Sequence, residues 1–137
     1  MAEAGIRSLL QTAARYLVSG GAATLLHWGT MAALIAAGLS ANLATALGAL
    51  AGATLNYVLQ FHFTFRSRQQ HATTMPRYLG ITFLSWCSNN AVFALIHGLT
   101  GLAAAPSQFL TTALVTVLNF FLYRRFVFNE PHHVPRP

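Results

Sequence analysis

Four long apolar stretches dominate the chain, separated by shorter polar or small-residue segments. They run over residues 16–37, 41–63, 78–99 and 106–123. A helical crossing of a bilayer needs about 20 predominantly apolar residues, so each stretch is long enough to cross once. The connections near 38–40 and 100–105 are short enough to join antiparallel helices. The pattern therefore predicts an all-α membrane protein with four transmembrane helices arranged as two helical hairpins.

The basic residues all lie on one side of this pattern. All eight are arginines, and they lie before the first stretch, between the second and third, and after the fourth. They are Arg7, Arg15, Arg66, Arg68, Arg77, Arg124, Arg125 and Arg136. The two short connections carry no formal charge. Because basic residues close to helix ends are retained in the cytoplasm, we expect both termini to be cytoplasmic.

The second half of the chain repeats the first. Arg15-Tyr16-Leu17 opens the first crossing and Arg77-Tyr78-Leu79 opens the third. Asn56 and Asn119, about 63 residues apart, are followed in register by two Phe-x-Phe pairs. Two hairpins of two crossings each must face the same way, so this is a parallel repeat. We expect each Phe-x-Phe pair to form a short extended stretch along the membrane surface.

These features define the expected organisation of the chain. Residues 1–14 form a cytoplasmic N-terminal segment, and residues 15–128 form the transmembrane domain. Within that domain the first repeat covers about 15–66 and the second about 77–128. The proline-rich segment 129–137 is expected to be a disordered cytoplasmic tail.

Composition excludes a soluble protein. The chain is 55% hydrophobic and 7% charged, whereas soluble domains carry about 25% charged residues. The net charge of +6 does not indicate nucleic-acid binding, because the arginines cluster at segment ends and not on a basic soluble face. Their first partners are membrane lipids, since each basic residue gains about 1 kcal/mol near anionic headgroups.

The acidic residues are both terminal, at Glu3 and Glu130. An ion-coupled exporter usually needs an intramembrane carboxylate, so a small-molecule exporter ranks last among the candidate functions. No phosphate-binding loop of the GxxxxGK type is present. The sequence has no nucleophile–base set or metal-ligand set at usable spacing. We therefore expect no enzymatic activity, no cofactor and no metal.

Asparagine and histidine occur at depth in the crossings. Asn56 lies about ten residues before Arg66, which places it near the bilayer centre at 1.5 Å per residue. An amide that faces lipid unpaired costs several kcal/mol. We therefore expect an inward-facing polar path formed by His27, Asn56, Asn89, Asn90 and Asn119. The alternative is hydrogen bonding between helices, worth about 0.6–2 kcal/mol per contact.

Glycine and tryptophan residues give two further predictions about helix packing. Gly48 and Gly52 fit the small-xxx-small motif, which predicts close helix packing on the second crossing. Trp28 and Trp86 are expected to be packing residues, with sugar stacking as the alternative.

Four arginines are candidates for phosphate binding. Arg15 and Arg77 begin crossings, where free backbone amides also favour an anion. Arg124 and Arg125 follow the fourth crossing and extend this basic collar. Guanidinium groups form paired, charge-assisted bonds to phosphate oxygens. The alternative role is to anchor the topology.

Together these motifs resemble the GtrA-like family of small four-helix bacterial membrane proteins. The resemblance covers about Arg15 to Phe128 and rests on four pieces: Arg15-Tyr16-Leu17-Val18-Ser19-Gly20-Gly21, Asn56 with Phe63-Thr64-Phe65, Arg77-Tyr78-Leu79, and Asn119 with Arg124-Arg125-Phe126-Val127-Phe128. The family often has asparagine or aspartate near the position of His27, so this chain departs from the pattern there.

The resemblance implies flipping of a polyprenyl-phosphate-linked sugar, such as one on undecaprenyl phosphate, across the bacterial cytoplasmic membrane. The sugar would serve cell-surface polysaccharide synthesis or cell-wall glycosylation. With no coupling site visible, transport would be passive, and a homo-oligomer would build the path because four helices enclose little volume. The competing function is a membrane anchor that recruits a glycosyltransferase, with the Gly48/Gly52 face as its docking surface.

Overall fold

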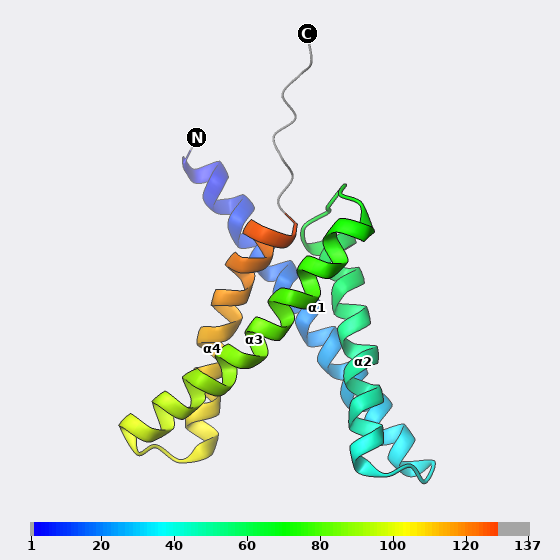
Figure 1. Cartoon of the computed structure of the whole chain (residues 1–137). Helices are drawn as coiled ribbons and strands as arrows, with labels where there is room; N and C mark the ends of the chain where they lie inside the picture. Colours follow the sequence, from blue (N-terminus) through cyan, green and yellow to red (C-terminus); the bar gives the residue numbers. More distant parts are fainter. Residues whose placement is uncertain (1, 129–137) are drawn as a thin grey trace. The chain divides into compact units, whose positions relative to one another are not determined.

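The computed structural model describes residues 2–128, except the side chains of residues 2–4, 104 and 105. The segment 129–137, for which the sequence predicts disorder, lies outside the described residues. The four main helices are α1 (Ala2–Ala36), α2 (Ala41–Leu59), α3 (His71–Thr100) and α4 (Ala104–Leu122). Each contains a segment long and apolar enough to cross a membrane. The predicted all-α fold with four transmembrane helices is confirmed (Figure 1).

The chain divides into two compact units, Met1–Ser67 and Arg68–Pro137. The first hairpin comprises α1, α2 and a terminal π-helical turn, η1 (Gln60–Thr64). The second hairpin comprises α3, α4 and the equivalent turn, η2 (Tyr123–Val127). Gly38 and Gly101 form the tight connections, with φ values of +92° and +65° that residues with a Cβ rarely adopt.

The first helix is longer than one crossing requires. It extends back to Ala2, whereas the apolar stretch begins at residue 16. Residues 2–14 contain alanine, leucine, glutamine and arginine, which are strong helix formers, and no proline. The N-terminal segment therefore continues the helix beyond the length that hydrocarbon needs.

The extended stretch predicted for each Phe-x-Phe pair is wrong. Both pairs lie in or directly after π-helical turns, in which the N–H of Phe65 donates to the Gln60 carbonyl and that of Phe128 to the Tyr123 carbonyl, each at 2.9 Å. An extended segment would leave such groups unpaired near the membrane, where a helical turn satisfies them. The turn also separates the two rings, since Phe126 is exposed and Phe128 is buried.

Equivalent positions of α2 and α4 face the partner helix of each hairpin. On α2 this face carries Ala44, Gly48, Gly52, Asn56 and, at the start of η1, Gln60. In register on α4 are Ser107, Thr111, Val115, Asn119 and, at the start of η2, Tyr123. All of these residues are buried except the two asparagines, which are partly buried. The repeat therefore keeps the position of the interface while changing its chemistry.

The glycines allow α1 and α2 to approach closely. A Cβ added to Gly48 would lie 2.6 Å from the His27 carbonyl oxygen, and one on Gly52 would lie 2.8 Å from the Ala23 carbonyl oxygen. Neither distance leaves room for a methyl group. The second hairpin has Thr111 and Val115 at these positions, and its two helices contact each other less extensively.

Candidate functional site

The arginine-bearing end of the first hairpin is organised by aromatic rings. The guanidinium carbon of Arg15 lies 5.8 Å from the centroid of the Phe63 ring, within the range of a cation–π interaction. The next residue, Tyr16, contacts Phe65 with ring centroids 6.5 Å apart. Successive residues of α1 therefore contact two phenylalanines, one in η1 and one directly after it. This holds Arg15 at the rim of the hairpin, partly buried.

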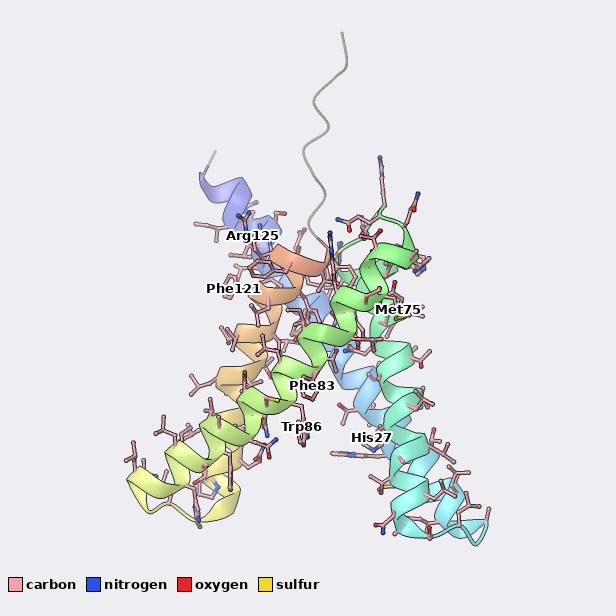
Figure 2. All side chains as sticks on the ribbon, in the orientation of Figure 1. His27, Met75, Phe83, Trp86, Phe121 and Arg125 are labelled. Atoms are coloured by element: carbon pink, nitrogen blue, oxygen red, sulfur yellow. The ribbon has the colours of Figure 1, made fainter. Side chains whose placement is uncertain are left out.

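The same end of the second hairpin is held by two tyrosines. Tyr78 on α3 stacks on Tyr123 with centroids 5.4 Å apart and an interplanar angle of 20°. Arg77 precedes Tyr78 and Arg124 follows Tyr123, so the stack brings both to one end of the hairpin. Arg77, Arg124 and Arg125 are all exposed, and Figure 2 shows Arg125 at this end of the second hairpin. Phosphate binding by these arginines and by Arg15 stays a prediction.

The first hairpin buries polar side chains beneath this rim. The hydroxyls of Ser19 and Thr64 share a hydrogen bond of 2.8 Å. Gln60 Nε2 donates to Asn56 Oδ1 at 3.0 Å, and the Gln60 side chain is 1% exposed. Within the described residues, Gln60 Oε1 has no hydrogen-bond partner. This hairpin therefore keeps an unused acceptor inside a closely packed interface.

His27 lies deeper in the same interface, on α1. Its ring carbon Cδ2 would be 2.9 Å from a Cβ on Gly48, so the imidazole fits only because that residue is glycine. The Nε2 atom is buried and has no hydrogen-bond partner among the described residues. His27 is therefore held by α2 as well as by its own helix.

The second hairpin carries hydrogen bonds between its helices at three levels. Thr82 and Tyr123 pair their hydroxyls at 2.9 Å, and Asn119 Nδ2 donates to Ser85 Oγ at 2.6 Å. Further along, Gln108 Nε2 donates to Asn89 Oδ1 at 3.3 Å and to Thr112 Oγ1 at 3.1 Å. We call this set the polar seam: Thr82, Ser85, Asn89, Gln108, Asn119 and Tyr123. Asn119 Oδ1 is buried and has no partner among the described residues.

Asn90 and the tryptophans differ from expectation. Asn90 is exposed and donates to the Trp86 carbonyl of its own helix at 2.7 Å, so the structure does not bring it into the interface of the hairpin. Trp28 and Trp86 are 59% and 65% exposed, so neither packs in the core of its hairpin. Trp86 instead stacks with Phe83, with centroids 6.2 Å apart (Figure 2).

The structure corrects one expectation about Gly48 and Gly52. Both glycines are buried against α1, with His27 and Ala23 as the nearest neighbours. They therefore hold the first hairpin together and are covered within it. A glycosyltransferase has no access to this face while the hairpin is formed, so the predicted docking surface is wrong.

Sequence patterns missed several residues of the two interfaces, including Ser19, Thr64, Thr82 and Tyr123. Alignment of the two repeats could have identified Ser19 and Thr64, because both positions change from polar to apolar together. Ser19 and Thr64 correspond to Ile81 and Val127, so both members of the hydrogen-bonded pair are apolar in the second hairpin. For the residues that the structure describes, no cluster of three or more His, Cys, Asp or Glu is placed to hold a metal ion.

The family described as GtrA/DPMS, transmembrane domain, matches residues 15–128, which include both hairpins. This family is associated with flipping of lipid-linked sugars or with glycosylation. No curated protein and no solved structure matches the chain.

Proposed function

Because this chain belongs to the GtrA/DPMS transmembrane-domain family, we propose that it flips a polyprenyl-phosphate-linked sugar across the bacterial cytoplasmic membrane. The translocated sugar supplies cell-surface polysaccharide synthesis or cell-wall glycosylation on the far side. The observation that carries this proposal is the family match over residues 15–128, because it spans all four membrane helices. The chain acts as a transporter and not as an enzyme.

Physical chemistry supports this assignment. Each sugar hydroxyl moved into hydrocarbon without a partner costs about 2–7 kcal/mol, and a phosphate charge adds more. Both hairpins hold amides and hydroxyls between apolar helices, with Asn56 and Asn119 at equivalent positions. Such groups lower the barrier for the sugar while the prenyl tail stays in lipid. Arginines at the helix ends, Arg15 and Arg77 among them, attract the phosphate.

The proposal includes topology and assembly. The arginine-bearing ends and both termini lie in the cytoplasm, and the two hairpins are oriented alike in the membrane. Movement is passive and is drawn outward as glycosyltransferases consume the sugar donor. Four helices enclose little volume, so a homo-oligomer completes the path.

Reconstituted vesicles test the transport function. We expect purified protein to accelerate the movement of a fluorescent polyprenyl-phosphate sugar between leaflets, measured by quenching with a membrane-impermeant reductant. Arg15→Ala should slow this movement, because it removes the guanidinium held at the rim by Phe63. Arg7→Ala is the matched control, because Arg7 is an exposed arginine of α1 about two turns before the rim.

Two other outcomes would contradict the proposal. No acceleration, together with stable co-purification of a glycosyltransferase, would assign the chain as a membrane anchor or scaffold. Efflux of small cations driven by a pH gradient would assign it as an exporter. Circular dichroism and gel filtration of each variant establish that lost transport does not reflect lost folding.

A further inference from the structure

We propose that the polar seam of the second hairpin is the binding site for the sugar hydroxyls, and that the closely packed interface of the first hairpin does not bind them. This inference rests on the proposed transport of a lipid-linked sugar and assigns the task to one of the two repeats. It is carried by three observations: the series of hydrogen bonds from α3 to α4 and η2, the buried unpartnered acceptor of Asn119, and the more extensive contact between the helices of the first hairpin.

The spacing of the seam suits a substrate that moves along a helix. Thr82, Ser85 and Asn89 are three and four residues apart, so they occupy one face of α3 over about two turns. Each has a partner on α4 or η2, from Tyr123 near the arginine-bearing end to Gln108. A sugar hydroxyl both donates and accepts hydrogen bonds. It can therefore insert between the two partners at each level, accepting from one and donating to the other, so neither partner is left unpaired as the sugar advances.

Asn119 gives the seam a hydrogen-bond acceptor that has no donor among the described residues. Its Nδ2 donates to Ser85 Oγ, which fixes the orientation of the amide. Its Oδ1 is buried and has no partner among the described residues. A buried carbonyl oxygen without a donor costs about 1–3 kcal/mol. A hydroxyl donated by the sugar removes this cost, so the site favours a hydroxyl-bearing ligand over an apolar one.

The seam is also accessible from its side. Thr82, Ser85, Asn89 and Asn119 are each partly exposed, and Gln108 is exposed. The side chains of Thr111 and Val115 lie on the interface face of α4 and are buried. The Oδ1 atom of Asn119 is itself buried, so a ligand reaches it only after side chains of the seam move.

The first hairpin offers no such exchange. Its residues in register with Thr82 and Ser85 are Gly20 and Ala23, which have no polar side chain. Gly48 and Gly52 bring the helices so close that a single methyl group would overlap a carbonyl oxygen. Gln60 does have an unpartnered oxygen, but it is 1% exposed within this close contact. A sugar ring has no entry there unless the hairpin separates.

Cysteine labelling tests the assignment through a readout other than transport. In a Cys87→Ser background, Ser85→Cys and Ala23→Cys place thiols at equivalent positions of the two hairpins. Protein in vesicles is treated with a charged methanethiosulfonate reagent, with and without a polyprenyl-phosphate sugar. We expect Ser85→Cys to react about tenfold faster than Ala23→Cys. This ratio corresponds to a difference of about 1.4 kcal/mol in the activation free energy of labelling. The sugar lipid should slow labelling at position 85, and polyprenyl phosphate without a sugar should slow it less.

A second pair, Asn89→Cys and His27→Cys, repeats the comparison at a deeper level should either first variant fail to fold. Equal labelling in both hairpins, or protection confined to the first hairpin, overturns the assignment. Equal protection by polyprenyl phosphate with a sugar and by polyprenyl phosphate without one also overturns the assignment.

Transport by the Cys87→Ser parent is measured in parallel. If the parent moves no sugar lipid, the proposed function fails. If it does while position 85 is neither labelled nor protected, the seam assignment alone fails.

Discussion

The helices of the first hairpin approach closely at two glycines, whereas those of the second are connected by side-chain hydrogen bonds at three levels. In the first, Gly48 and Gly52 leave no space for a methyl group between α1 and α2. In the second, Thr111 and Val115 occupy the equivalent positions, and the Asn119–Ser85 bond connects the helices. Two copies of one sequence pattern therefore form one fold with two kinds of interface. Without a hydrophobic force between helices in lipid, either solution is sufficient for association.

At the arginine-bearing ends, the first hairpin has a polar pair of residues where the second has an apolar pair. Ser19 and Thr64 form a buried hydrogen bond in the first hairpin. The second has Ile81 and Val127 at these positions, and Val127 is fully buried. Either pair is stable in this position, because neither leaves a buried hydroxyl without a hydrogen-bond partner. In the first hairpin, side-chain hydrogen bonds between the two arms lie near the arginine-bearing end, at Ser19–Thr64, and near the connecting turn, at Thr45–Met31. In the second hairpin they occur at three levels along the helices.

The largest effect is expected from Gly48→Thr, which gives the first hairpin the residue that the second has in register. The added side chain would overlap the His27 carbonyl, a backbone atom that cannot move without shifting the helix. We expect a loss of about 3 kcal/mol in the free energy of unfolding, at the upper end of overpacking costs. Unfolding in mixed detergent micelles, followed by circular dichroism, measures it. Gly21→Thr is the control, because a Cβ at Gly21 meets nothing within 4 Å. Equal losses in both variants would refute close packing at Gly48.

A smaller effect is expected from Thr64→Val, which introduces the valine of the second hairpin. The Ser19 hydroxyl would then lose its buried partner, at a cost of about 1–2 kcal/mol. Removing both partners in Ser19→Ala/Thr64→Val should restore most of this stability, since neither hydroxyl is then left unpaired. A double-mutant cycle of unfolding free energies measures the coupling. Additive losses would mean that the two hydroxyls act independently.

The smallest effect is expected from Phe63→Leu at the rim of the first hairpin. It removes the ring beneath Arg15, and such contacts contribute about 0.5–1 kcal/mol at exposed sites. In an Arg15→Gln background the same change should cost measurably less, because no cation remains to be stabilised. Phe126→Leu, at the equivalent position of the second hairpin, controls for loss of the ring itself. An unchanged cost in both backgrounds would show that Phe63 acts only through apolar packing.

Sequence patterns predicted the fold more fully than the site. The four apolar stretches identify the helices, and their number is confirmed. The hairpin ends were predicted wrongly, because alternate phenylalanines are compatible with an extended strand as well as with a π-helical turn. Only the bonds from Phe65 to Gln60 and from Phe128 to Tyr123 distinguish the two. Asn56 and Asn119 were recognisable as a repeated pair, but their different partners, Gln60 and Ser85, were not.

The number of membrane helices follows directly from the order of residues, because hydrocarbon thickness and the need to pair every backbone group act locally along the chain. The pairing of side chains does not follow in this way. Whether a serine, threonine or amide finds a partner depends on how far apart two helices lie, and that separation depends on residues elsewhere in the interface. Glycine at two positions closes the first hairpin, and threonine and valine at the same positions space the second. The polar seam therefore emerges only when both helices are placed together.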